Sequence, residues 1–234
     1  MTETKLERRR PPKFELIAGN VCLDFINTLD DRTSAQPKEL LANYYELARF
    51  GEDTGILTPE QLDYFYENVH LMIDDAADAL RRAINLREAM YAVFSALLSR
   101  QTVPAAAMDT LNAYIQDAAL HSRLVQSKKV QSKKVQSEKV QSEKVQGEVQ
   151  REGRCEWRFD DMGSALDAML WPIARAAADL LASSDVALVR ACSSPTCQWF
   201  FLDTSKNHHR RWCSMKQCGN RAKVRRFYAK KKTA

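Results

Sequence analysis

The sequence has no long hydrophobic run, and none of its stretches approaches the roughly 18 consecutive apolar residues that a membrane-spanning helix needs. Its charged N-terminus, MTETKLERRRPPK, leads into no apolar segment, so no secretory signal is expected. Only seven glycines occur in 234 residues, and they form no phosphate-binding loop. With 45% hydrophobic and 28% charged residues, the sequence predicts a globular, cytoplasmic protein whose thiols stay reduced.

Acidic residues are missing from the C-terminal end of the chain. Residues 204–234 contain eleven Lys or Arg and no Asp or Glu, which leaves 24 basic against 30 acidic residues in 1–203, a net charge of −6 there. The overall charge of +5 therefore hides two electrostatically different parts. Only the C-terminal part has the charge to bind a polyanion such as a nucleic acid.

Residues 14–184 are expected to form a helical domain, because apolar residues recur there at helical spacing. Asn20 is placed to cap a short first helix, and Pro37 is expected to open a second one at its first helical position. The segment Thr58-Pro59-Glu60-Gln61 has the pattern of a capping box, which predicts the start of a third helix.

Longer helical patterns follow in the same domain. Apolar side chains predict helices over 74–100, from Pro104 to Ala119 and over 164–182. Pro172 is expected to kink the last of these, because proline removes a backbone donor and clashes with the preceding turn.

A pentapeptide repeat, beginning VQSKK VQSKK VQSEK, occupies residues 125–149. A valine every fifth residue advances roughly 140° around a helix and changes face on a strand, so these valines share no side to bury. We expect a solvated insertion, with a basic interaction arm as the alternative. Its flanks, 121–125 and 155–159, are expected to pair as a hairpin that the repeat interrupts.

Four of the six cysteines lie near the C-terminus with the spacing C-x4-C-x15-C-x4-C. Zinc takes four ligands at tetrahedral corners, and two short cysteine pairs joined by a longer excursion supply them. In a reducing compartment this is favoured over the alternatives, two disulfides or four independent buried thiols. The sequence therefore predicts one structural Zn²⁺, held by Cys192, Cys197, Cys213 and Cys218.

The residues between and after the cysteines predict a strand, a turn and a helix. Residues 198–202 are typical of a strand, with 210–212 as its returning partner and His208 in the turn between them. A final helix is expected from Asn220 to Lys231. A cysteine knuckle, a hairpin and then a helix is the order of a treble-clef zinc finger. The apolar arc expected to pack on the hairpin aromatics consists of Val224, Phe227 and Tyr228.

The basic residues of this module predict a nucleic-acid contact surface. Arginines on a zinc-anchored helix can reach a groove or the phosphates of a duplex. A run of charge is more often only a solvated face, but eleven cations without one acid favour a polyanion. The expected contacts are Lys206, His208, Arg210, Arg211, Asn220, Arg221, Lys223, Arg225 and Arg226.

A small polar cluster on and after the first helix is a candidate site for an effector. The alternative is that Asp24 and Asn27 cap or bridge neighbouring helices, and this alternative is favoured because buried polar groups usually satisfy the backbone. The members of the candidate site are Asp24, Asn27, Thr28 and Arg32.

Five segments resemble known families. The CGNR tetrapeptide at 218–221, the segment WFFLD at 199–203 and RWCSM at 211–215 are similar to a CGNR-type zinc finger. The segments GNVCLDFINTL at 19–29 and LWPIA at 170–174 resemble the ABATE-type domain that precedes this finger in bacterial proteins. The resemblance covers nearly the whole chain except the repeat.

The resemblance implies a bacterial transcription regulator, with an ABATE-like helical domain over 14–184 and a CGNR zinc finger over 185–234. It carries zinc ligation over to the same four cysteines, and it places Asn220 and Arg221 at the start of the basic helix. The expected fold class is mainly α, a helical domain with a small β-hairpin, followed by a treble-clef-like zinc finger.

The predicted function is a DNA-binding transcription regulator, in which the basic helix contacts double-stranded DNA. The helical domain would then sense a small molecule or form a homodimer. The alternative is RNA or ribosome binding through the same tail, with Trp199 and Trp212 stacking on bases. A protein–protein adaptor remains open. An enzyme is not expected, because four cysteines close the zinc sphere and no His-x-Glu accompanies Pro195-Thr196-Cys197.

Overall fold

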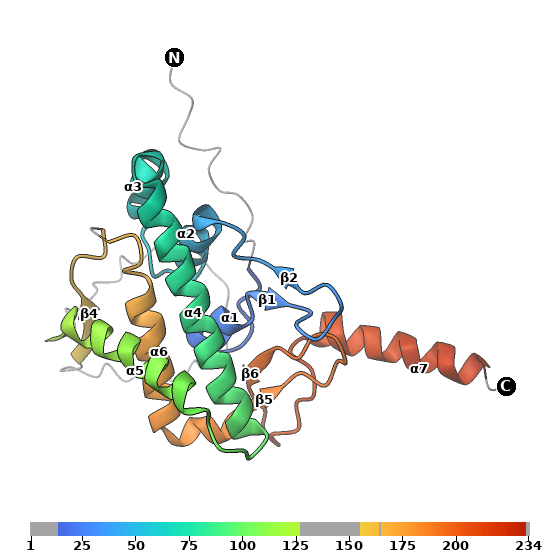
Figure 1. Cartoon of the computed structure of the whole chain (residues 1–234). Helices are drawn as coiled ribbons and strands as arrows, with labels where there is room; N and C mark the ends of the chain where they lie inside the picture. The colour runs from blue at the N-terminus through green and yellow to red at the C-terminus, as the bar shows by residue number, and fades with distance from the viewer. Residues whose placement is uncertain (1–13, 127–154, 164, 233–234) are drawn as a thin grey trace, which may run out of the picture.

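The computed structural model describes residues 14–126, 155–163 and 165–232, and helices dominate this part of the chain (Figure 1). The helices are α1 (Val21–Ile26), α2 (Tyr44–Asp53), α3 (Pro59–Asn68), α4 (Ile73–Leu98), α5 (Ala105–Leu120), α6 (Leu170–Ala182) and α7 (Asn220–Lys232). The strands form antiparallel pairs, namely β1 (Leu29–Asp30) with β2 (Lys38–Glu39), β3 (Ser122–Gln126) with β4 (Cys155–Phe159), and β5 (Val189–Ala191) with β6 (Phe200–Leu202). This architecture confirms the mainly α class. Most of the predicted insertion lies outside the described residues.

The predicted helix caps are present at α1 and α3. The Asn20 side chain accepts a hydrogen bond of 3.0 Å from the Cys22 N–H. At α3 the Thr58 hydroxyl accepts from the Gln61 N–H, and the Gln61 side chain accepts from the Thr58 N–H, which completes the capping box. Such caps stabilise a helix by about 1 kcal/mol each, because they satisfy N–H groups that the helix itself cannot.

The prediction that Pro37 opens a helix is wrong. The residues after it form β2, in which Glu39 lies opposite Leu29 of β1, and helix α2 begins only at Tyr44. Burial of a charge decides the outcome, because the Glu39 carboxylate binds both terminal nitrogens of Arg87 at 2.7 Å. The Arg87 side chain is 2% exposed, so this bidentate partner is needed to offset its desolvation.

Helix α6 begins at Leu170, six residues later than the expected start. The segment before it is held by tertiary contacts, including a hydrogen bond of 2.9 Å from the Tyr44 hydroxyl to the Leu166 carbonyl. The late start places Pro172 in the first turn of the helix, where a missing N–H removes no intrahelical bond. The expected kink therefore has no cause.

The hairpin expected to flank the repeat is present. β3 pairs with β4 in an antiparallel register that places Leu124 opposite Trp157. The Trp157 ring lies under the guanidinium of Arg175, 3.9 Å from the ring centroid, which joins the hairpin to α6. The chain thus enters and leaves the repeat at one pair of neighbouring strand ends.

Helix α4 runs along the middle of the molecule, and α1, α2, α5 and α6 pack against it (Figure 1). The fully buried side chains include Phe25, Phe50, Leu86 and Phe94, and the same apolar cluster continues into Phe201 of β6. We refer to residues 14–182 as the helical region and to residues 189–232 as the finger. These two parts share one hydrophobic core.

Specific bonds fasten the finger to the helical region. The Asn27 side chain donates to the Phe200 carbonyl and accepts from the Phe200 N–H, both at 2.9 Å, so it substitutes for a neighbouring strand at the edge of β6. The Leu202 N–H donates to the Ala18 carbonyl at 2.8 Å. The Phe200 ring also stacks on Tyr91 of α4, with 5.4 Å between centroids and 9° between planes. The orientation of the finger is therefore set by α1 and α4.

Candidate metal centre and basic surface

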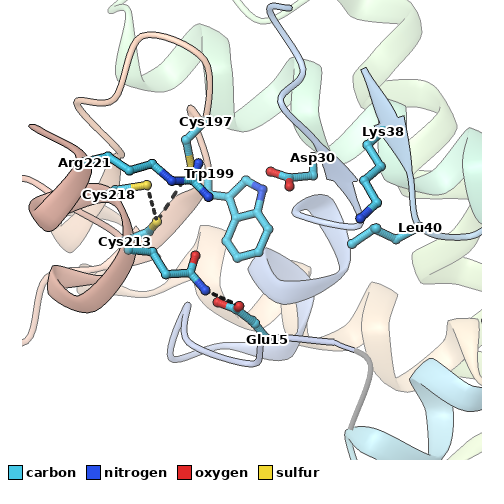
Figure 2. A pocket seen from close by; sticks show the side chains of 10 residues that line it. Glu15, Asp30, Lys38, Leu40, Cys197, Trp199, Cys213, Cys218 and Arg221 are labelled. Carbon is cyan, nitrogen blue, oxygen red and sulfur yellow. Dashed lines mark hydrogen bonds between the residues drawn. The ribbon is translucent and has the colours of Figure 1, made fainter. Parts of the chain in front are cut away.

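Four cysteine side chains converge in the finger. The Sγ atoms of Cys192, Cys197, Cys213 and Cys218 all lie within 4.8 Å of one another, and all four residues are buried. The Cys213 sulfur is 3.6 Å from that of Cys197 and 3.7 Å from that of Cys218 (Figure 2). Sulfurs placed tetrahedrally at about 2.3 Å from one Zn²⁺ are about 3.8 Å apart, so the observed spacing fits the ion.

The cysteine thiols are free rather than joined in disulfides. Desolvation by burial raises the pKa of the Cys218 thiol, so a cation is needed to hold this ligand as a thiolate. Bound zinc supplies that charge and a covalent-like crosslink between the two halves of the finger. Because four protein sulfurs complete a tetrahedron, the site is that of one structural zinc ion.

The first cysteine pair lies in a tight connection between β5 and β6. The Cys192 N–H donates to the Trp199 carbonyl at 2.8 Å, which closes the turn around the pair. Gln198 adopts a left-handed backbone conformation with φ of 51°, which turns the chain sharply after Cys197. These local interactions hold the first two ligands close together.

The second pair lies at the start of the C-terminal helix. A π-helical turn, η3 (Met215–Gly219), carries Cys218 and leads directly into α7. The Ser214 hydroxyl accepts from the Gln217 N–H at 3.4 Å and the Ser214 carbonyl accepts from the Gly219 N–H at 3.0 Å. As a result, the last zinc ligand lies two residues before the helix residue Asn220, and zinc fixes where α7 begins.

The strand pairing within the finger differs from the sequence prediction. β6 pairs with β5, with Arg190 opposite Phe201, and not with residues 210–212. Residues 204–211 are instead held as a loop by Asp203, which is fully buried and accepts from the N–H groups of Ser205 (3.1 Å) and Arg210 (2.9 Å). Hydrogen bonds from Ser205 and then Arg210 lower the pKa of Asp203. Sequence reasoning missed this residue, because an aspartate before a polar turn is typical of any turn.

The structure divides the predicted nucleic-acid contacts into two groups. Arg210 is directed inward, because its guanidinium donates to the Trp212 carbonyl at 3.0 Å and lies 4.4 Å from the centroid of the Phe201 ring. The Arg226 side chain lies outside the described side chains. The remaining predicted contacts are exposed, and they are Lys206, His208, Arg211, Asn220, Arg221, Lys223 and Arg225.

A basic groove lies between the first cysteine pair and the start of α7, with a volume of about 680 Å³. Arg221 and Arg225 line it from α7, and the Arg225 guanidinium donates to the Ser194 hydroxyl at 3.3 Å. Lys216 also lines the groove, although the sequence analysis did not single it out. Its only signal in the sequence was its place in the acid-free segment. The groove thus presents three cations on zinc-anchored backbone.

Helix α7 projects away from the rest of the molecule (Figure 1). The expectation that its apolar arc packs on the hairpin aromatics is therefore wrong. Val224 is 53% exposed, Phe227 64% and Tyr228 61%, whereas Ala222 on the opposite side is buried. The cause is geometric, because η3 sets the direction of α7 and the helix points away from the other elements. The two aromatic rings contact each other edge to face, with 5.7 Å between centroids.

The polar residues of the candidate effector site each make a structural contact. Asp24 accepts from the Ala18 N–H at 2.9 Å, and desolvation by burial raises its pKa to about 6. Thr28 donates to the Phe25 carbonyl at 2.7 Å, and Arg32 donates to Glu88. Asn27 bridges to β6 as described above. These contacts are those of the alternative in which the cluster joins neighbouring elements, and an effector site at these residues stays a prediction.

Within the described ranges, no helix combines the length and the apolar character that crossing a membrane requires.

The fold and the metal centre define a helical protein with a C-terminal four-cysteine zinc finger. Comparison with family models agrees in both parts and in their order. Residues 19–184 match the ABATE family, described as "putative stress-induced transcription regulator", and residues 189–231 match the CGNR zinc finger. The chain belongs to the ABATE family, and neither matched family is a family of enzymes. A search of curated proteins found no match for the chain.

Proposed function

We propose that the protein is a DNA-binding transcription regulator whose zinc finger holds α7 against double-stranded DNA. The observation that carries this proposal is the basic groove, in which Lys216, Arg221 and Arg225 surround one cavity at a helix start that zinc fixes. No acidic residue occurs from residue 204 onward, so nothing in this segment repels phosphate. Arginine is suited to such a site because its planar guanidinium binds phosphate or a guanine edge in a bidentate manner.

The proposal assigns different roles to the cationic and the apolar side chains of α7, although Val224 lines the same groove as Arg221 and Arg225. Arg221 and Arg225 face the groove and the first cysteine pair, where phosphate would lie. Val224, Phe227 and Tyr228 form an exposed apolar strip, suited to contact with thymine methyl groups or the sugar edge of a groove. Recognition by sequence would come from the strip and from Asn220, and most of the affinity from the cations.

RNA binding is the second candidate, and the structure changes which residues would carry it. Trp199 is only 8% exposed, so it cannot stack on bases in the described conformation. Phe227 and Tyr228 are exposed aromatic rings beside cations, which is the arrangement that stacks on single-stranded bases. Competition between duplex DNA and single-stranded RNA for the same protein separates the two functions.

The test is selection of bound sequences from random duplexes by the full-length, zinc-loaded protein, followed by titration of the selected duplex at several salt concentrations. We expect a common motif and a log–log salt slope of about −3 or steeper, corresponding to release of counterions from three or more phosphates. The full chain is used because the finger shares its core with the helical region. Absence of binding to any duplex at low salt would refute the proposal.

A further inference from the structure

A second cavity, of about 190 Å³, lies where the finger meets the β1–β2 pair (Figure 2). Asp30, Lys38 and Leu40 line it from the helical region, and Trp199 and Arg221 line it from the finger. The zinc ligands Cys197, Cys213 and Cys218 form part of its wall, so it directly adjoins the metal centre. Its volume is that of about six water molecules, which suits a small metabolite rather than a chain segment.

The cavity contains an unsatisfied hydrogen-bond donor. The indole N–H of Trp199 is buried and has no partner among the described residues, although the side chain is only 8% exposed. Buried polar groups in native proteins are nearly always bonded, so an orphan donor facing a cavity indicates a missing acceptor. In Figure 2 the indole ring lies between Arg221 and the cysteines on one side and Asp30, Lys38 and Leu40 on the other, with its nitrogen toward Asp30.

The charged groups around the indole include two unpaired cations. Among the described residues, neither Lys38 nor Arg221 forms an ion pair, and both line the cavity. Asp30 faces them and uses one carboxylate oxygen to accept from the Asp31 N–H at 2.8 Å, which leaves its other oxygen available. Glu15 also lines the cavity, and its carboxylate accepts a hydrogen bond from the Gln217 side chain. The cavity therefore offers two cations and the indole N–H for an anionic group, and two carboxylates, those of Asp30 and Glu15, for a cationic group.

We propose that this cavity binds a small zwitterion of amino-acid size. Its carboxylate accepts from the Trp199 N–H and faces Lys38 and Arg221, and its ammonium group faces Asp30. Leu40 and the indole face form an apolar wall for a short side chain. A simple amine or a simple carboxylic acid satisfies only half of this arrangement, so the zwitterion is preferred over either.

The position of Arg221 connects this cavity to the basic groove, because the residue lines both. A carboxylate in the cavity recruits the guanidinium away from the groove, so the bound ligand weakens contact with DNA. This second part rests on the proposed function, whereas ligand binding does not. By linkage, DNA must weaken ligand binding by the same factor.

The binding test uses the full-length, zinc-loaded protein and each of the twenty standard L-amino acids, measured by thermal shift and then by calorimetry. We expect one or a few amino acids to raise the Tm in a saturable manner, and the matching amine and carboxylic acid to have no effect. The concentration of each amino acid is raised in 10-fold steps to about 10 mM, at which a ligand with a Kd near 1 mM still raises the Tm measurably. If none of the twenty raises the Tm, the cavity holds water only and the proposal is wrong.

Two variants locate the binding to the cavity. Trp199→Phe keeps the ring but removes the N–H, and Lys38→Met keeps the aliphatic stem but removes the charge. Each variant is expected to bind the amino acid about tenfold or more weakly, since each removes a charge-assisted bond. Trp199→Phe without ligand should fold normally and retain one zinc, because it deletes an unpaired donor. Trp157→Phe on the exposed face of β4 is the matched control. Unchanged affinity in both cavity variants would overturn the assignment.

The regulatory part has its own readout. The amino acid found by calorimetry should weaken binding of the selected duplex by about fivefold or more, and Arg221→Gln should abolish this effect. If DNA binds and no amino acid does, only the cavity proposal fails. If an amino acid binds and no DNA does, the proposed function fails and the ligand site stands. An amino acid that binds without changing DNA affinity contradicts the coupling through Arg221.

Discussion

The helical region and α7 use their charged residues in opposite ways. In the helical region the most buried cation, Arg87, is held by Glu39, Glu88 and Thr28, and its charge serves to fix β2 on α4. On α7 the exposed cations Arg221 and Lys223 have no ion-pair partner among the described residues. The difference separates charged side chains that are paired within the fold from those that are accessible to another molecule.

Apolar residues show the same contrast. Phe25 and Phe50 of the helical region are fully buried, whereas Phe227 and Tyr228 of α7 are more than half exposed. A helix whose aromatic residues face solvent gains nothing from them in folding. Both rings are therefore accessible for the proposed role in recognition.

Loss of a metal ligand is expected to have the largest effect, and to affect the finger but not the helical region. Cys218→Ala should unfold the finger and abolish DNA binding, since loss of one ligand leaves zinc with an incomplete sphere and structural zinc contributes on the order of 10 kcal/mol to such modules. The helical signal in circular dichroism should fall only by the part due to α7. Zinc content and DNA titration measure the effect. Cys155→Ser, at an exposed free cysteine, is the control and should change neither. A chelated protein that still binds DNA at full affinity would contradict this account.

The junction between the regions depends on Asn27. Asn27→Ala leaves both the N–H and the carbonyl of Phe200 unpaired in a buried position, so the free energy of unfolding should fall by about 2–4 kcal/mol. Urea denaturation measures this value. Asn68→Ala, which removes one hydrogen bond within α3, is the matched control and should cost less than about 1 kcal/mol. An equal loss in both variants would show that the finger does not rely on this bridge.

The free cations of α7 should affect binding and not stability. Arg221→Ala is expected to weaken binding to the selected duplex by about fivefold to tenfold and to reduce the salt slope by about 1, with zinc content unchanged. Arg81→Ala removes the same charge from the exposed side of α4 and controls for net charge. If both variants weaken DNA binding equally, the affinity comes from long-range electrostatic attraction and not from contacts in the groove.

The apolar strip of α7 allows a sharper test of the same contrast. The double change Phe227→Ser with Tyr228→Ser should alter the free energy of unfolding by less than about 0.5 kcal/mol, because both side chains are exposed. Affinity for the selected duplex should fall about threefold or more. A loss of stability above about 1 kcal/mol would mean that these rings pack against the protein.

The smallest expected effect concerns Asp24 in the helical region. Burial raises its pKa to about 6, so the folded state binds the proton more tightly than the unfolded chain does. Stability is therefore highest at low pH with respect to this group, falls as pH rises, and levels off above about pH 6. Asp24→Asn keeps the acceptor for the Ala18 N–H and removes this dependence. Urea denaturation measures the free energy of unfolding at each pH. The free energy of unfolding of the variant minus that of the wild type should increase by about 1 kcal/mol from pH 5 to pH 7.5. If this difference in the free energy of unfolding does not change with pH, the pKa of Asp24 is not near 6.

Local signals in the sequence predicted a large share of the fold. The capping box at Thr58 and the cap at Asn20 depend on side chains bonding to backbone two or three residues away, so they form as expected. The hairpin around the repeat was predicted from the two segments that flank it. The four cysteines were identified from spacing, because tetrahedral ligation constrains how far apart paired ligands can be in sequence.

The errors occur where distant residues decide. The predictions at Pro37 and at the start of α6 rested on local helix propensity. In the structure, the buried Arg87 holds the residues after Pro37 as a strand, and the Tyr44 hydroxyl bonds the segment before α6. The partner of β6 was assigned to the nearer segment in sequence, whereas β5 and Asn27 occupy its two edges. Helical periodicity grouped Val224 with two aromatics on one arc but could not show that nothing covers this arc.

The sequence by itself determined the class of the protein, the four zinc ligands and the concentration of positive charge at one end, since composition and ligand spacing are properties of the chain alone. Only the tertiary structure decided that Asn27 holds the finger, that α7 projects with its apolar side exposed, and that Trp199 and Arg221 border a cavity shared by both regions. The physical reason is that burial and pairing depend on which distant surfaces meet, and periodicity along one segment carries no information about its neighbours.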